Sequence, residues 1–267
     1  MPFAISGKTA IVTGAANGVG LAIARHFLRE GANVVMADMD EVHMAKEVGE
    51  DAEKDEHLRL FAGDLRERLT IANLLSATVD AFDRVDILVN ASRQVALSDP
   101  LDPEKDGVEQ LLNQNLLTAL RVSQTVARRM IKQGEDQEEG PLGSIINLSS
   151  IAANRTRPEL LGYSVSTAAL DQMTRSLAVA LAPERIRVNA VAFGSVMSAS
   201  LKEALKDHRA FREDILSGTP LHRIAKPSEV SDAVQYLASD ASSFVTGQVI
   251  TVDGGRSVID AVPAPVH

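Results

Sequence analysis

The chain has 267 residues, 45% of them hydrophobic, with a formal net charge of −9 and no cysteine. This length and apolar content fit one large α/β domain or two small ones, with a well-buried core. The acidic balance argues against a nucleic-acid surface, which needs a basic face, and the absence of cysteine excludes disulfides and thiolate metal sites.

The first residues, MPFAISGKTAIVTG, lack the basic region and long apolar core of a secretory signal. No apolar run approaches the roughly 20 residues that a membrane span needs. The histidines are scattered and show no metal-ligand spacing. We therefore expect a cytoplasmic protein that has no metal site and has neither a membrane nor a nucleic acid as a partner.

Short apolar runs alternate with amphipathic helical segments along the chain. The runs read as buried strands at residues 9–14, 32–38, 57–64, 85–90, 143–150, 186–193 and 248–255. Residues 17–31 read as a helix that places Val19, Ile23 and Phe27 on one face and ends at Gly31. Strict alternation predicts a Rossmann-type, doubly wound parallel sheet with helices on both faces, in a single domain.

Two segments interrupt this alternation. Residues 133–143 form an acidic stretch that we expect to be a solvated loop. Residues 195–229 form a long, charged, helix-rich insertion after the sixth strand. Ligands bind beyond the carboxyl ends of the strands in such sheets, so residues 195–226 are a candidate lid over a substrate. The alternative is a plain surface excursion.

The first predicted strand leads into TGAANGVG, which has glycines at positions 14, 18 and 20 and opens a helix. Glycine permits a tight turn and lets backbone N–H groups approach a pyrophosphate, and the helix N-terminus adds partial positive charge. Asp38 ends the second strand, where a carboxylate can accept hydrogen bonds from the ribose hydroxyls of an adenosine. The pattern predicts a site for NAD(H), because Asp38 would repel the 2′-phosphate of NADP(H).

With these motifs in view, the sequence resembles the short-chain dehydrogenase/reductase family, in its compact single-domain form, which includes bacterial 3-oxoacyl-reductase-like members. The resemblance runs from Lys8 to about Ile259. It rests on TGAANGVG, AGDL, DILVN, LLNQNLLTAL, GSIINLSS and the last two strands with their turns, IRVNAVAFG and VTGQVITVDGG.

The resemblance implies a cofactor site and an assembly. The implied cofactor contacts are Gly14, Asn17, Gly18, Val19, Gly20, Asp38, Asp64, Leu65, Asn90, Ala91 and Val196. The substrate would be a small alcohol/carbonyl pair, and the protein would be a homo-oligomer, either a tetramer or a dimer.

The resemblance also implies catalytic residues. In the family a tyrosine passes a proton to or from the substrate oxygen while hydride moves at the nicotinamide, a serine hydrogen-bonds the same oxygen, and an asparagine orders a helix kink and a water. Tyr163, Ser150 and Asn115 match these positions. The family lysine, four residues after the tyrosine, holds the nicotinamide ribose and favours the phenolate. Thr167 stands in its place.

Other departures fall on the same side of the site. Arg93 stands where the family has a glycine after the fourth strand, and Phe193-Gly194 replaces the usual Pro-Gly. Arg93 could supply the missing charge, block the nicotinamide space or face solvent. A cation about 5 Å from a phenolate is worth roughly 3 kcal/mol at an effective dielectric constant of about 20, so its loss predicts alcohol oxidation slowed on the order of 100-fold and carbonyl reduction slowed less.

The sequence therefore predicts an NAD(H)-dependent oxidoreductase that moves hydride between nicotinamide and a small alcohol/carbonyl pair. The rival is a non-catalytic, NAD-binding regulatory or structural subunit. A third possibility is an enzyme that uses the same pocket for non-redox chemistry. The residues do not name the substrate.

Overall fold

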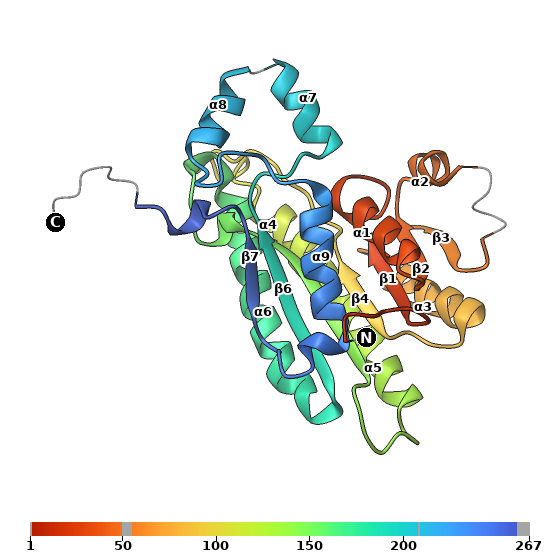
Figure 1. The fold of residues 1–267 in the computed structure, drawn as a ribbon. Coiled ribbons are helices and arrows are strands. Elements are labelled where there is room, and N and C mark those ends of the chain that lie inside the picture. Colours follow the sequence, from red (N-terminus) through yellow and green to blue (C-terminus); the bar gives the residue numbers. More distant parts are fainter. Residues whose placement is uncertain (1, 50–54, 208, 261–267) are drawn as a thin grey trace.

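The computed structural model describes residues 2–49, 55–207 and 209–260, drawn in Figure 1. Its strands are β1 Thr9–Thr13, β2 Asn33–Asp38, β3 Leu58–Ala62, β4 Ile87–Asn90, β5 Gly143–Ser150, β6 Ile186–Phe193 and β7 Val249–Val252. All neighbouring strands run parallel, in the order β3-β2-β1-β4-β5-β6-β7. The order reverses beside β1, which makes the gap between β1 and β4 the topological switch point. The predicted doubly wound Rossmann-type fold is confirmed.

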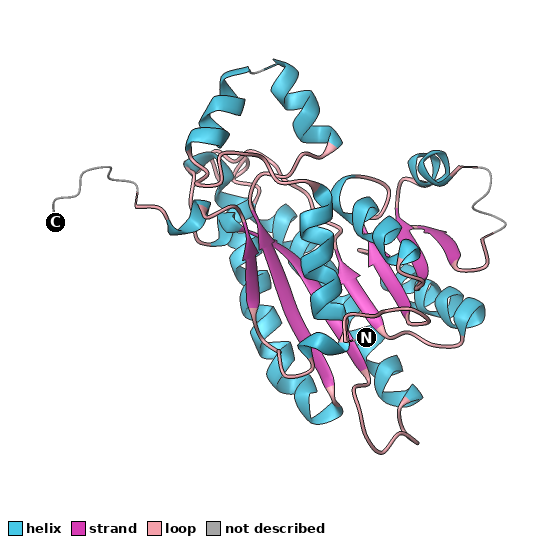
Figure 2. Cartoon of the chain, in the orientation of Figure 1, coloured by secondary structure: helices cyan, strands magenta, loops and turns pink. Residues whose placement is uncertain are grey.

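Helices connect the strands and cover both faces of the sheet (Figure 2). They are α1 Gly18–Arg29, α2 Glu41–Val48, α3 Arg68–Phe82, α4 Val108–Leu111, α5 Thr118–Gln133, α6 Leu161–Leu181, α7 Ala199–Asp207, α8 Arg209–Ser217 and α9 Pro227–Ala238. A π-helix, η2 Leu112–Leu117, joins α4 to α5, and short 3-10 turns are η3 Ile151–Ala153, η4 Pro158–Leu160, η5 Ala182–Glu184, η6 Asp240–Ser242 and η7 Arg256–Val258.

The core lies in two layers because successive strand residues point to opposite faces. Ala10 and Val12 of β1 join the layer under α1 and α9, whereas Ile11 joins the layer under α3, α5 and α6. β1 is buried along its whole length. A parallel strand that is buried on both faces reads as a continuous apolar run, which is why the sequence pattern finds it.

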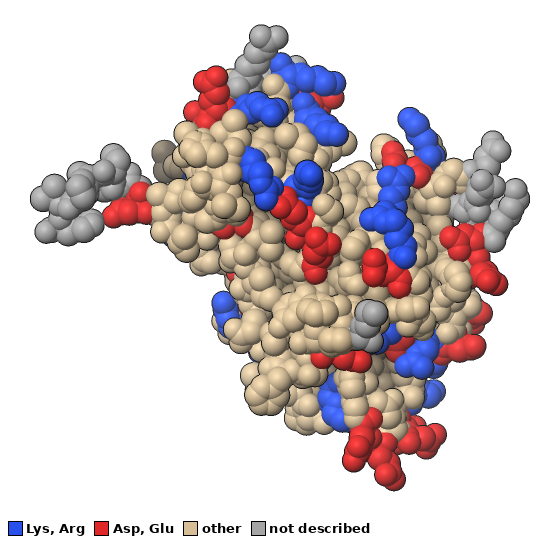
Figure 3. Space-filling model, in the orientation of Figure 1, with Lys and Arg blue, Asp and Glu red and all other residues tan. Residues whose placement is uncertain are grey.

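The two interrupting segments differ in position. The acidic stretch connects α5 to β5, with Glu135, Asp136, Glu138 and Glu139 exposed, and acidic side chains gather at that end of the molecule in Figure 3. Helices α7 and α8 lie at the opposite end, beyond the carboxyl edge of the sheet (Figure 1). A bridge between Val196 and Ala225 closes the base of this excursion.

Candidate active site

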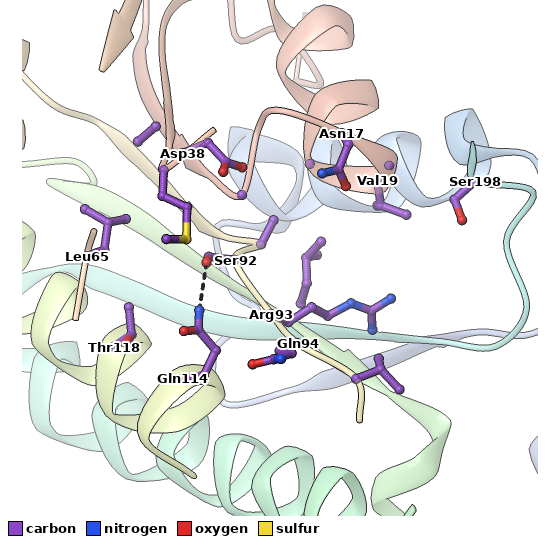
Figure 4. Close-up of a pocket in the computed structure, with 18 of the residues that line it drawn as sticks. Asn17, Val19, Asp38, Leu65, Ser92, Arg93, Gln94, Gln114, Thr118 and Ser198 are labelled. Atoms are coloured by element: carbon purple, nitrogen blue, oxygen red, sulfur yellow. Dashed lines mark hydrogen bonds between the residues drawn. The ribbon is translucent and has the colours of Figure 1, made fainter. Parts of the chain in front are cut away.

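A cleft of about 840 Å³ opens at the carboxyl ends of the strands, at the switch point of the sheet (Figure 4). Its walls come from the β1–α1 turn, the ends of β2, β4 and β6, the residues after β3, and the start of the α7–α8 excursion. This volume is typical of cofactor and small-molecule sites.

The glycine turn shapes one end of the cleft. Gly14 and Gly18 have φ values of +65° and +59°, in the left-handed region. A Cβ on Gly14 would lie 2.6 Å from the Cα of Ser92, and one on Gly20 would overlap the carbonyl oxygen of Gly14. Asn17 caps α1 without a side-chain hydrogen bond, so the first N–H groups of the helix are left for a ligand. The turn therefore fits a pyrophosphate.

Asp38 lies beside this turn at the end of β2. Its Oδ2 accepts a hydrogen bond of 3.0 Å from the Ala16 N–H and its Oδ1 accepts one of 3.1 Å from the Asp40 N–H. The side chain is half-buried, and no lysine or arginine of the described ranges pairs with it. The carboxylate is thus held in place by backbone groups, and its charge is not neutralised by a partner.

The residues after β3 form the neighbouring wall. Asp64 pairs with Arg66 at 2.6 Å, and the hydrogen bond from Arg66 holds the pKa of the Asp64 carboxyl below its usual value. Leu65 is buried and faces the cleft beside them.

Every predicted cofactor residue lines the cleft except Asn90. The Asn90 amide nitrogen donates hydrogen bonds to Ser123 Oγ at 2.9 Å and to Asn147 Oδ1 at 2.8 Å. Its side chain points from β4 toward α5 and β5, below the cleft floor. The Asn90 amide therefore ties the end of β4 to its neighbours, and a contact of Asn90 with the cofactor stays a prediction.

The four predicted catalytic residues lie behind the cleft wall and do not line it. Tyr163 is in the first turn of α6 and is 4% exposed. Ser150 ends β5, and its Oγ accepts a 3.1 Å hydrogen bond from the Ala152 N–H, which leaves the hydroxyl hydrogen free to donate. The 3-10 turn that follows Ser150 packs against α6.

Asn115 lies in the π-helix and fastens three segments together. Its Oδ1 accepts from the Gln94 N–H at 2.8 Å, and its Nδ2 donates to the Gln94 carbonyl at 2.9 Å and to Ser166 Oγ at 3.1 Å. π-helical turns mark distortions of a helix that are often functional. The structure thus has the helix irregularity that the family resemblance implies at Asn115.

Thr167 does not face the cleft. It is 2% exposed, and its Oγ1 hydrogen-bonds the carbonyl oxygens of Tyr163 at 2.8 Å and Ser164 at 3.1 Å. A threonine inside a helix commonly bonds the carbonyl one turn back. The Thr167 hydroxyl is thus turned into its own helix, and a role for Thr167 in the lysine's place stays a prediction.

Arg93 fills the position between the cleft and Tyr163. Its Nη1 donates a 2.6 Å hydrogen bond to the Tyr163 hydroxyl oxygen, and its guanidinium carbon lies 4.2 Å from the centre of the Phe193 ring. Figure 4 shows its side chain extended along the cleft. Of the three alternatives for Arg93, the solvent-facing one is excluded.

Other cleft residues were not anticipated. They are Ser92, Gln94, Gln114, Thr118, Ser198 and Leu201, among others. Gln114 Nε2 donates to Ser92 Oγ at 3.3 Å across the cleft, as the dashed line in Figure 4 marks. The sequence did place Ser198 and Leu201 in the candidate lid and Gln114 and Thr118 in the motif LLNQNLLTAL, but it gave none of these side chains a role of its own.

Comparisons with known proteins identify the family of the chain. The sequence model of a family described as enoyl-(acyl carrier protein) reductase matches residues 14–257. The chain belongs to the short-chain dehydrogenase/reductase family. The 3-oxoacyl-[acyl-carrier-protein] reductase of Thermotoga maritima is 35% identical over 254 residues, which cover 94% of this chain and 98% of that protein.

Two solved structures of this family show how relatives use the fold. A 7α-hydroxysteroid dehydrogenase complexed with NADH and 7-oxo glycochenodeoxycholic acid has a TM-score of 0.85 at 30% identity, covering 95% of this chain and 96% of that one. A gluconate 5-dehydrogenase from Burkholderia cenocepacia, in complex with NADP and tartrate, has a TM-score of 0.85 at 29% identity, covering 97% and 98%. Both neighbours thus hold a nicotinamide dinucleotide, without a 2′-phosphate in the first (NADH) and with one in the second (NADP).

Neither the family match nor these relatives support the non-catalytic alternative.

Within the described ranges, no helix combines the length and apolarity that crossing a membrane requires. The same residues hold no group of three or more His, Cys, Asp or Glu side chains that could bind a metal ion.

Proposed function

We propose that this protein is an NAD(H)-dependent oxidoreductase that transfers hydride between nicotinamide and the carbon of a small alcohol/carbonyl pair. The observation that carries the choice of NAD(H) is the Asp38 carboxylate, held by backbone N–H groups beside the glycine turn. A carboxylate in this position accepts hydrogen bonds from ribose hydroxyls and repels a 2′-phosphate.

The two ends of the cleft would hold different parts of the cofactor. The turn from Gly14 to Gly20 and the N-terminus of α1 would bind the pyrophosphate, with Asp38 at the ribose of the adenosine. Asp64 and Leu65 would flank the adenine. Ala91 and Val196 line the other half, where the nicotinamide would lie.

When bound, the cofactor would supply hydride-transfer chemistry at its nicotinamide, beside Ala91 and Val196, giving a hydride to the carbonyl carbon in reduction and accepting one in oxidation. In reduction Tyr163 gives its hydroxyl proton to the substrate oxygen, so that the product is the neutral alcohol. Ser150 donates a hydrogen bond to the same oxygen, because its own oxygen already accepts from the Ala152 N–H. Asn115 positions the segment after β4 against α6 and so holds the site together.

The excursion made by α7 and α8 is the proposed substrate lid, residues 195–226 of the single dinucleotide-binding domain. Ser198 and Leu201, at its start, already line the cleft. Connections held on a rigid scaffold carry binding residues in many folds, which suits a region that selects among substrates. We extend the proposal to a homo-oligomer, since Val179 on α6 and Phe244 before β7 are exposed.

The test is calorimetric titration with NADH, followed by a carbonyl panel assayed by loss of NADH absorbance. The panel includes 3-oxoacyl thioesters, an oxo bile acid and keto sugar acids. We expect NADH binding, turnover of at least one carbonyl, and loss of that turnover in Tyr163→Phe with NADH affinity retained, because the phenol acts on the substrate. Tyr236→Phe is the control. NADH binding without turnover on any compound contradicts the proposal.

A further inference from the structure

Three departures from the family pattern meet at one place in the structure. Thr167 has replaced the lysine and turned into its helix, Arg93 has replaced a glycine, and Phe193 has replaced a proline. The last two touch each other, and Arg93 also touches Tyr163. Residues that are widely separated in the sequence, from the segment after β4, the end of β6 and the start of α6, thus build one cluster.

We infer that Arg93 supplies to Tyr163, from the segment after β4, the positive charge that the family's lysine supplies from α6, and that Phe193 holds Arg93 in place. The inference rests on the proposed function in one respect, namely that Tyr163 moves the proton. Arg93 is therefore a positioning residue for the tyrosine.

The charge of Arg93 is available to the phenol. A guanidinium stays protonated throughout the working pH range. Among the described residues no carboxylate lies within ion-pair distance of it, and stacking on an aromatic face leaves the charge in place. A cation that donates to a phenol oxygen stabilises the phenolate more than the neutral phenol.

The hydrogen-bond geometry leaves the tyrosine free to act. The Tyr163 oxygen accepts from Arg93 Nη1, so its own hydrogen remains available for a substrate oxygen. The half-buried guanidinium also lines the cleft, where its other N–H groups face the space that a substrate would enter. One side chain thereby connects the cleft to the buried phenol.

Other charged groups on the elements packed around Tyr163 do not compete with Arg93. They are Asp106 before α4 and Glu109 within it, Arg155 and Glu159 before α6, Asp171 further along α6, and Asp253 after β7. None of them forms a hydrogen bond or ion pair with Tyr163 or Arg93 in the described part of the chain.

The composition of the chain permits a direct measurement. It has two tyrosines and no tryptophan, so in a Tyr236→Phe background the phenolate absorbance reports Tyr163 alone. The variants to compare in that background are Arg93→Met, which removes the charge but keeps length, Arg93→Lys, which keeps the charge, and Phe193→Leu, which removes the stacking ring. Each is titrated with alkali in the absence of substrate and cofactor, over the range where far-ultraviolet circular dichroism stays native.

We expect Arg93→Met to move the midpoint of the absorbance titration upward by about one to two pH units, and Arg93→Lys to move it less. The midpoint shift in Phe193→Leu should lie between those of Arg93→Met and Arg93→Lys, because the Phe193 ring no longer holds the guanidinium against Tyr163. Adding Thr167→Lys to Arg93→Met should move the midpoint back. An unchanged midpoint in Arg93→Met overturns the inference.

The kinetic counterpart separates this inference from the proposed function. In alcohol oxidation, Arg93→Met should lower the rate at neutral pH by about 10- to 100-fold and move the rising limb of the pH profile upward, with little change in the KM for NAD⁺. A higher rate in Arg93→Met means that arginine blocks the site and overturns the inference. A shifted absorbance titration in a protein that turns over no compound supports the contact and contradicts the proposed function instead.

Discussion

Asp38 is placed to choose between the two nicotinamide dinucleotides. We expect NADH to bind at least about tenfold more tightly than NADPH, since 1.4 kcal/mol already gives that factor and like charges in contact cost more. Asp38→Ser should lower the ratio of NADH affinity to NADPH affinity by at least about tenfold, because the carboxylate that repels the 2′-phosphate is removed. Calorimetric titration with both cofactors measures this ratio.

The matched control is Asp40→Ser. Asp40 is an exposed carboxylate two residues further on, and it caps α2 through the His43 N–H at 2.9 Å without lining the cleft. Its loss should leave the NADH:NADPH ratio unchanged. Equal or tighter NADPH binding by the unmodified protein would show that Asp38 does not make the choice.

At the residue scale, the sequence locates residues whose positions follow from a motif between a strand and a helix. The glycine turn follows a buried strand and opens a helix, so the positions of Gly14, Gly20 and Asp38 on the cleft follow from the motif. The motifs do not determine where the side chains of Asn90 and Thr167 point, because the direction of a side chain depends on packing and not on its place in a motif. The Arg93 contact lies in an irregular segment whose path no periodicity determines.

The Asn115 side chain joins the π-helix to the segment after β4 and to α6. Asn115→Ala removes the part-buried hydrogen bonds to the Gln94 backbone and the buried one to Ser166. We expect a loss of about 1–3 kcal/mol in the free energy of unfolding, measured by urea denaturation. Asn113→Ala, an exposed asparagine in the same π-helix, is the control and should change it by less than about 0.5 kcal/mol. Equal effects would contradict the role of Asn115.

The start of α9 gives the chain a pH-dependent contact. Glu229 accepts from the Lys226 N–H at 2.8 Å and pairs with Arg223 at 2.6 Å, and the Arg223 hydrogen bond in particular lowers the pKa of Glu229 from 4.5 to about 2. A carboxyl whose pKa is lower in the folded state stabilises the fold above its unfolded pKa, and this contribution is lost as pH falls toward about 2.

Glu229→Gln should therefore destabilise the protein near neutral pH by no more than about 1 kcal/mol, since the pair is solvent-screened. The difference from the unmodified protein should shrink between pH 4.5 and about 2. Urea denaturation at a series of pH values measures it, and a difference that stays constant over this range would count against the contact.

Elements were predicted from the sequence more reliably than contacts. All seven strands lie within the predicted runs. Central strands such as β1 and β4 are buried on both faces and read as apolar runs, whereas β3 and β7 at the edges of the sheet are more exposed. The segment after residue 195 was expected to be helical, but its division into α7 and α8 was not. Short amphipathic helices of this kind have weak boundaries in a sequence, since charged residues surround each of them.

At the scale of the whole molecule, the proposed homo-oligomer predicts a mass above the 28.5 kDa of one chain by light scattering. Val179 on α6 is 78% exposed and Val42 on α2 is 80% exposed. We expect Val179→Asp to lower the assembled mass, because α6 would bury it against another copy, whereas Val42→Asp should leave the mass unchanged. A monomeric unmodified protein, or equal effects of the two substitutions, would contradict the proposal.

The pairing of α1 with α9 has a consequence for the synthesis of the chain. Val230, Val234 and Leu237 of α9 share a core layer with Ile23 and Phe27 of α1. His26 and Gln235, whose side chains lie 2.6 Å apart at this contact, are separated by 209 positions. At about 5–20 residues per second, a ribosome needs roughly 10–40 s to make the second helix after the first. During that time α1 packs on the sheet without α9 beside it, so part of its apolar face stays uncovered. A nascent chain that stops before α9 should therefore be a target for chaperones and should not bind NADH.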